Sequence, residues 1–225
     1  MHPVALSPAA ARELLALALL FTQAVIAVPL IIRAARTRDA DGASIAGEAI
    51  WVAGGLGWAV YGAGAGQPSV LASGVLAMLT SGTMAALLWR SAPEQHRTAV
   101  HLTALTVACL AIGFWAGGAA GLSIMLGMFS VVQFLPQLTR SVRYLRDGVP
   151  ARGVSAPGAY MRALYTGGWA VYAGAWFLWD VGIDGVLWPL LIWGCVGVAT
   201  FALQGLSART RSLSARSVSG QLLRR

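Results

Sequence analysis

The sequence predicts an all-α membrane protein with seven transmembrane helices in a 3+1+3 arrangement, that is, two three-helix bundles joined by one further helix. Three observations lead to this prediction: an apolar composition, seven long apolar runs and an internal repeat. Hydrophobic residues make up 57% of the 225 residues and charged residues only 11%, whereas a soluble domain keeps about a quarter of its residues charged. The composition therefore favours a chain that lies in a lipid bilayer.

Seven apolar runs are each long enough to cross a bilayer, which takes roughly 20 residues of helix. They lie at about 13–32, 45–65, 68–89, 99–118, 122–139, 157–178 and 185–204. Each should be helical, because lipid offers no hydrogen-bond partner to a free backbone N–H or C=O. The first run is too long for the apolar part of a cleaved signal peptide. Cys109 and Cys195 fall inside two runs, where we expect packing residues and neither a disulfide nor a metal site.

Positive charge is concentrated in alternate loops. The formal net charge is +8, and fourteen of the sixteen arginines follow the first, third and fifth runs or fill the C-terminal tail. Arginine stays on the cytoplasmic side during membrane insertion. The chain is therefore predicted to cross the cell membrane with its N-terminus outside and its C-terminus in the cytoplasm. The basicity reflects this topology, and no nucleic-acid partner is expected.

One pentapeptide occurs twice. Residues 57–61 and 168–172 both read GWAVY, 111 residues apart, and Pro29 and Pro136 match at an offset of 107. Self-similarity of this length indicates an internal duplication. Because basic loops follow the first and fifth runs, both copies must point the same way. The fourth run supplies the extra crossing that two parallel repeats require.

This layout divides the chain into four parts. Residues 1–89 form the first three-helix repeat, and residues 90–121 form a basic loop with the linker helix. Residues 122–206 form the second repeat. Residues 207–225 are a basic cytoplasmic tail that we expect to be disordered.

The chain resembles the PQ-loop proteins, and within them the sugar-transporting SWEET and half-size SemiSWEET proteins. The resemblance covers nearly the whole chain. It is carried by Leu135-Pro136-Gln137 before a basic loop, by a weaker Val28-Pro29-Leu30 at the equivalent place, and by W-x-x-Y at Trp58/Tyr61 and Trp169/Tyr172. It implies two bundles around a central cavity, with each first helix bending at its proline during alternating access.

Trp58 and Trp169 are the first candidates for solute contact. Both lie past the middle of their runs, where a buried indole N–H needs a polar partner. A central cavity would supply that partner, and each flat ring would stack on one face of a bound sugar. The alternative is ordinary helix packing, helped by the neighbouring glycines.

Further solute contacts are expected on the third helix of each bundle. The resemblance implies an asparagine there, but the chain contains none. The spacing after the proline that opens each of these helices points instead to Ser73 and Gly194. Gln133 lies within two turns of Pro136 and would either line the cavity or join two helices.

Moving parts are predicted at the two ends of the cavity. Pro29 and Pro136, the latter followed by Gln137, each remove one helix hydrogen bond and create either a hinge or a fixed kink. At the outer end, the gate would combine two tyrosines one turn beyond the tryptophans with the acidic residues of the last outer loop. These gate residues are Tyr61, Tyr172, Asp180 and Asp184.

Glu48 and Arg162 are charged residues inside apolar runs. Each such charge costs about 2.5–3.5 kcal/mol on the insertion scale. The offset of 111 makes Arg162 equivalent to position 51, one turn from Glu48. The two residues are candidates for a charge pair across the pseudo-twofold axis, or for an interfacial pair near the inner membrane surface.

The preferred function is a transporter that moves a small polar solute, a sugar above all, by alternating access and without a cofactor. One alternative is a proton-coupled amino-acid transporter of the same architecture, which would need a titratable cavity residue such as Glu48. Another is a non-transporting membrane subunit or receptor. No enzymatic activity is expected, because His101 alone in its run offers no pairing of a nucleophile with a base. A homo-oligomer is left open.

Overall fold

The computed structural model describes residues 7–37, 45–91, 93–135, 156–179 and 188–222, together with 138, 142 and 146. These residues form six α-helices and two short 3₁₀ turns, and no strand occurs among them. The α-helices are α1 (Pro8–Thr37), α2 (Ile45–Gly64), α3 (Pro68–Leu88), α4 (His96–Val132), α6 (Ala156–Trp179) and α7 (Trp188–Leu222); the 3₁₀ turns η1 (Trp89–Ser91) and η2 (Pro93–Gln95) connect α3 to α4. The all-α prediction is confirmed.

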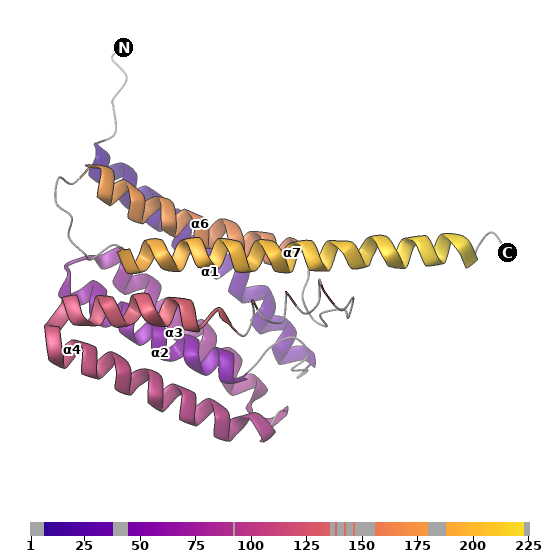
Figure 1. The fold of residues 1–225 in the computed structure, drawn as a ribbon, viewed down its shortest axis with the longest axis horizontal. Helices are drawn as coiled ribbons and strands as arrows, with labels where there is room; N and C mark the ends of the chain where they lie inside the picture. The colour runs from indigo at the N-terminus through magenta and orange to yellow at the C-terminus, as the bar shows by residue number, and fades with distance from the viewer. Residues whose placement is uncertain are drawn as a thin grey trace, which may run out of the picture.

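Helix α4 folds back on itself, as the ribbon shows (Figure 1). Its backbone leaves the helical region at Gly117 and Gly118, and Gly118 has a φ of 57° that side chains other than glycine rarely adopt. On either side of this turn, Gly113 and Gly121 meet so closely that a Cβ on Gly121 would collide with the Gly113 carbonyl. The predicted fourth and fifth runs are therefore two antiparallel segments of one element, residues 96–116 and 119–132. This explains why six helices are found where the sequence predicts seven.

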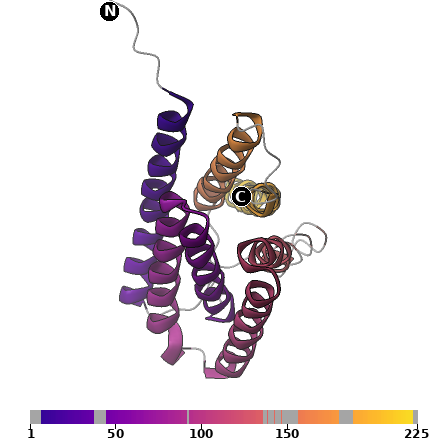
Figure 2. The same cartoon turned by 90° about the vertical axis from the view of Figure 1, so that its left-hand side faces the viewer.

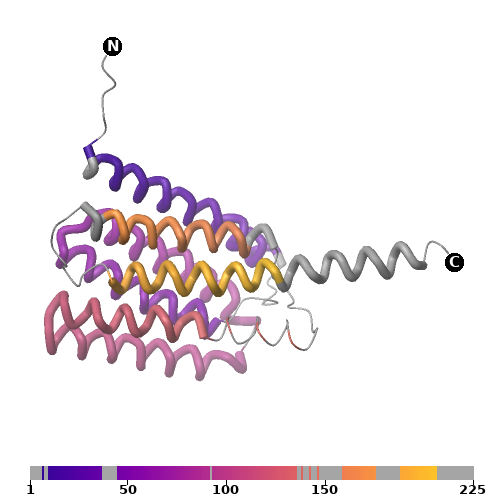
Figure 3. Tube along the Cα trace, turned by 45° about the horizontal axis from the view of Figure 1, so that its top comes forward, coloured from indigo at the N-terminus to yellow at the C-terminus, as the bar shows by residue number. Residues whose placement is uncertain are grey.

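Within the described residues, four helices contain stretches apolar and long enough to cross a membrane: Ala10–Arg36, Pro68–Ser91, Pro93–Val132 and Trp188–Leu206. Many of their large apolar side chains are exposed, among them Phe21, Leu79 and Trp115. Exposed apolar side chains on this scale suit a lipid environment better than water. Helices α2 and α6 carry the GWAVY copies and are richer in glycine and aromatic rings, and they lie among the other helices (Figures 2 and 3).

The helix contacts repeat in pairs. In the first group of helices, α3 packs on α1 and α2. In the second group, α7 packs on α4 and α6. Between the groups α1 packs on α6, and α4 packs on α2. The second segment of α4 thus takes the place in its group that α1 takes in the first.

The glycine of each GWAVY copy lies at a crossing between the two groups. A Cβ on Gly57 would lie 2.8 Å from Leu126 Cδ2 on α4, and a Cβ on Gly168 would collide with Leu19 Cδ2 on α1. Leu19 and Leu126 are themselves 107 residues apart, which is the offset of the two prolines. Small residues let helix backbones approach closely. In each GWAVY copy, the glycine therefore packs against the equivalent leucine of the opposite group of helices.

The two prolines predicted as hinges differ in what can be described. Helix α1 continues without a break through Pro29, whereas α4 ends at Val132, four residues before Pro136. The last turn tightens there, because Phe134 N–H donates to the Val131 carbonyl at 3.2 Å. A proline at position 136 has no backbone N–H, so it cannot donate a hydrogen bond to the Val132 carbonyl. Pro136 and Gln137 themselves lie outside the described residues.

Helix α7 is longer than predicted. The seventh apolar run ends near residue 204, yet the helix continues to Leu222 and projects beyond the other helices (Figure 1). The predicted division of the chain at residue 207, with a disordered tail beyond it, stays a prediction. An apolar window ends where polar residues begin, and a helix need not end at the same place.

Candidate solute-binding site

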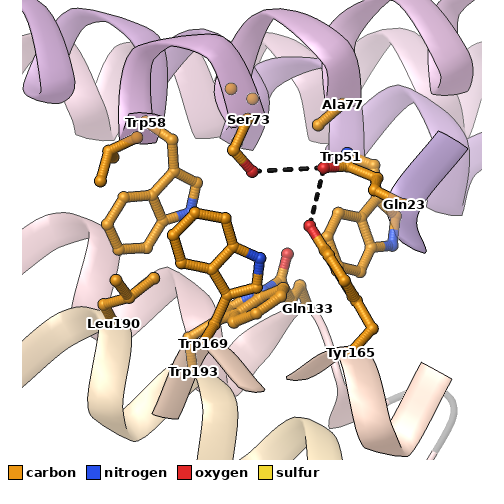
Figure 4. A pocket seen from close by; sticks show the side chains of 14 residues that line it. Gln23, Trp51, Trp58, Ser73, Ala77, Gln133, Tyr165, Trp169, Leu190 and Trp193 are labelled. Carbon is orange, nitrogen blue, oxygen red and sulfur yellow. Dashed lines mark hydrogen bonds between the residues drawn. The ribbon is translucent and has the colours of Figure 1, made fainter. Parts of the chain in front are cut away.

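A cavity of about 60 Å³ lies between the two groups of helices (Figure 4). We call it the aromatic cavity, because four tryptophans line it: Trp51, Trp58, Trp169 and Trp193. Its remaining lining comes from Gln23, Gly54, Gly55, Val70, Ser73, Gly74, Ala77, Gln133, Tyr165 and Leu190. At roughly 15 Å³ for one water, the cavity has room for about four water-sized groups.

A hydrogen-bonded node joins three helices at the edge of this cavity (Figure 4). Gln23 Oε1 on α1 accepts from Tyr165 Oη on α6 at 2.8 Å and from Ser73 Oγ on α3 at 3.3 Å. The amide oxygen therefore uses both of its lone pairs within the protein. The node ties the first group to the second at the level of the cavity.

The two W-x-x-Y motifs have the same local geometry. The Trp58 and Tyr61 rings meet edge to face with centroids 6.0 Å apart, and the Trp169 and Tyr172 rings do so at 5.2 Å. Residues three apart share a helix face, and edge-to-face packing is a favourable arrangement for aromatic rings. Each tryptophan lines the cavity while its tyrosine lies buried behind it.

Both tyrosines lie in the core at one end of the cavity. Tyr61 is 2% and Tyr172 0% exposed. Tyr172 Oη is 3.1 Å from Ser69 Oγ on α3, so this hydrogen bond also crosses between the two groups. The structure thus places the predicted gate tyrosines in packed positions, with Asp180 and Asp184 outside the described residues.

Three buried N–H donors around the aromatic cavity have no hydrogen-bond partner among the described residues: Gln133 Nε2, Trp169 Nε1 and Trp193 Nε1. The Trp169 indole nitrogen points toward the Tyr165 hydroxyl without meeting hydrogen-bond geometry (Figure 4). A buried donor without a partner costs free energy. A ligand with acceptor oxygen atoms, or ordered water, would satisfy these groups.

A second cavity of about 120 Å³ adjoins the first and shares Gln23, Trp51 and Tyr165 with it. We call it the charged cavity, because Glu48 and Arg162 both line it. The rest of its lining is Ile26, Ala27, Leu30, Thr80, Ser81, Met84, Thr166 and Phe201. Glu48 lies in the first turn of α2, at the end opposite to Tyr61, so the two cavities follow one another along the helices.

Most of the predicted solute contacts gather at the aromatic cavity, but Gly194 does not. Trp58, Trp169, Ser73 and Gln133 all line it. A Cβ on Gly194 would instead lie 2.7 Å from the Thr166 carbonyl oxygen on α6.

The helix packing corrects the alignment of α3 with α7. Gly74 approaches Gly55 on α2 in the way that Gly194 approaches Thr166 on α6, and residues 55 and 166 are 111 apart. Gly194 is therefore the counterpart of Gly74, and matching positions of α3 and α7 are 120 residues apart in the sequence, a register of 120. The counterpart of Ser73 is Trp193, which does line the cavity.

Sequence reasoning missed three aromatic residues of the site: Trp51, Tyr165 and Trp193. A signal for two of them was present, because Trp51 is seven residues before Trp58 and Tyr165 is four residues before Trp169. Both spacings keep a side chain on one helix face. Trp193 could be found only with the corrected register.

The comparisons with known proteins add no identity to this site. No family model, curated protein or solved structure matches the chain. Within the part of the chain that the structure describes, no three His, Cys, Asp or Glu side chains gather as metal ligands would. What the site can do must follow from its own residues.

Proposed function

We propose that this chain is a multi-pass membrane transporter that moves a small polar solute by alternating access between two three-helix bundles. The observation that carries the proposal is the aromatic cavity, because polar groups from both groups of helices converge there inside an otherwise apolar chain. Ligand sites of membrane transporters lie near the bilayer midplane at the interface between repeats. The resemblance to PQ-loop proteins favours a sugar as the solute.

A 3+1+3 arrangement fits the helix contacts. Dividing α4 at Gly117 and Gly118 yields seven segments, of which residues 96–116 would be the linker. We further propose that the protein lies in the cell membrane with its C-terminus in the cytoplasm, because the arginine-rich loops lie on that side. Glu48 and Arg162 then lie toward the cytoplasm and the buried tyrosines toward the outside.

Alternating access would require the two ends of the cavity to open in turn. The outer end would open by separating Tyr172 from Ser69, whose hydrogen bond joins the two groups. Pro29 and Pro136 would provide the bending points near the cytoplasmic side. Opening of the inner end would change the charged cavity first.

The test is uptake by the purified protein in liposomes, measured for labelled sugars and amino acids with and without a pH gradient. We expect saturable exchange of at least one solute class, reduced by Gln23→Ala. The matched control is Gly82→Ala, because a Cβ at Gly82 meets only Val52 Cγ2 at an ordinary 3.8 Å. Saturable binding without any flux would refute transport and support the receptor alternative.

The amino-acid alternative is kept as a second candidate because of one observation. Glu48 is a carboxylic acid that lines a cavity inside a predicted span, and acids in such places serve as proton relays in transporters. Uptake that needs a proton gradient and is lost in Glu48→Gln would favour this alternative. Uptake of a sugar without a gradient would favour uniport.

A further inference from the structure

The charged cavity contains two opposite charges that do not satisfy each other. Glu48 and Arg162 line the same cavity, and each is the charged group that acts on the other. Among the described residues, they form no ion-pair contact. Both side chains are partly buried.

Each charge is held by a neighbour of its own. The Ser81 side chain lies beside the Glu48 carboxylate on the first group of helices. The Arg162 guanidinium carbon lies 5.7 Å from the centre of the Phe201 ring, within the range of a cation–π interaction. The two charges thus lie on different helices, α2 and α6, and both line the charged cavity.

We propose that the charged cavity binds a compact zwitterion, with a carboxylate or sulfonate at Arg162 and an ammonium group at Glu48. An anion alone would be attracted by Arg162 but repelled by Glu48. A cation alone would be attracted by Glu48 but repelled by Arg162. A neutral polyol would add no charged partner beyond the one that each residue already has in the other, inside a predicted span where charge is costly. A molecule with both charges compensates both residues at once.

The surrounding groups suit this orientation. Thr80 and Thr166 line the cavity, and their hydroxyls donate to backbone carbonyls of the preceding turn of their own helices. Trp51 and Phe201 also line the cavity, and the Phe201 ring already meets the Arg162 guanidinium. The guanidinium presents a planar fork of donors that matches the two oxygens of a carboxylate.

This inference names a different solute class from the sugar favoured above, and it rests on the proposed function only for the passage of the ligand, since binding can be measured without transport. The zwitterion would occupy the charged cavity and meet the Gln23–Tyr165 hydrogen bond as it moves into the aromatic cavity. That bond is the polar link across the boundary shared by both cavities.

The experiment measures equilibrium binding of labelled glycine to the purified full-length protein in lipid nanodiscs. The competitors are β-alanine, taurine and glycine betaine as zwitterions, acetate and methylammonium as single charges, and glucose as a neutral polyol. We expect the zwitterions to compete at least about tenfold better than any single-charge or neutral compound. Equal competition by acetate or methylammonium, or no saturable binding of any zwitterion, would overturn the proposal.

Variants locate the site. Glu48→Gln and Arg162→Gln should each weaken zwitterion binding about tenfold or more, while Gly82→Ala should bind like the unaltered protein. Wild-type affinity in both charge variants would overturn the assignment. If either variant fails to fold, the competitor series still decides, because it uses the unaltered protein.

The same preparation separates this inference from the proposed function. Hexose exchange in liposomes without zwitterion binding would leave transport standing and overturn the inference. Zwitterion binding without flux of any solute would support the inference and refute the transporter.

Discussion

Alanine at Gly74 is a direct test of the helix packing that builds the cavity wall. A Cβ at this position would lie 2.6 Å from the Gly55 carbonyl oxygen and closer still to the Ala59 amide nitrogen. Ordinary contact begins near 3.4 Å. Because the colliding atoms belong to the backbone of α2, α3 would have to move away by about 1 Å to reach ordinary contact with the Ala59 amide nitrogen, rather than turn a side chain aside.

The cost is that of overpacking, typically about 1–3 kcal/mol. Replacing glycine by alanine inside a helix also stabilises it by up to about 1 kcal/mol, which would hide part of the loss. Gly82→Ala in the same helix carries the same gain without the collision, since its nearest neighbour lies at 3.8 Å. The difference between the two variants therefore isolates the collision.

The assay is thermal unfolding in detergent, followed by tryptophan fluorescence at one fixed scan rate because unfolding of such proteins is often irreversible. For a chain of this size 1 kcal/mol shifts Tm by about 2–4 °C. Gly74→Ala should therefore melt roughly 2–12 °C below Gly82→Ala, toward the larger value because backbone is involved. Equal melting temperatures would refute the close approach of α2 and α3.

The second group of helices offers an independent copy of this test. A Cβ at Gly194 would lie 2.7 Å from the Thr166 carbonyl oxygen, whereas a Cβ at Gly174 would meet nothing within 4 Å. Gly194→Ala should be destabilised relative to Gly174→Ala in the same way. Loss at Gly74 without loss at Gly194 would contradict the register of 120 between α3 and α7.

Three further outcomes are expected. Trp58→Ala and Trp169→Ala should each weaken solute binding by on the order of 1 kcal/mol, the value of an aromatic contact beyond area burial, and each should reduce fluorescence quenching by the solute; normal binding in either would make that ring a packing residue. Tyr165→Phe removes the 2.8 Å hydrogen bond to Gln23 and should lower unfolding stability by about 1 kcal/mol, measured by thermal unfolding, with an unchanged Tm counting against the node. A reporter active only in the cytoplasm should work when fused after Arg225 and fail at the N-terminus, and the reverse pattern would refute the predicted topology.

Much of the helical framework was predictable because apolar runs end at recognisable residues. The runs at 45–65, 68–89 and 157–178 differ from α2, α3 and α6 by at most one residue at either end. Proline opens α3, where its missing N–H costs nothing. Helices α1 and α7 extend past their runs because polar residues outside the hydrocarbon region can remain helical, and hydropathy does not register them.

The site was most predictable where both repeats carry the same residue. Trp58 and Trp169 stand at matching positions, and both line the aromatic cavity. The Gln23–Tyr165 hydrogen bond could not be found in this way, because the matching residues are Ser130 and Gly54. A contact between helices of different repeats also depends on how the helices rotate, which no run of letters in one helix specifies.

The two repeats keep equivalent packing contacts, but their residues differ around the cavities. Gly57 and Gly168 still receive equivalent leucines, so the pentapeptide persists where two backbones must approach. Around the cavities the matched pairs have diverged: Trp51 with Arg162, Gly54 with Tyr165, and Ser73 with Trp193. A symmetric lining would accept a solute in two equivalent orientations, whereas the matched positions of this lining differ in size and polarity. The solute that fits it should itself have two different ends and bind in one orientation.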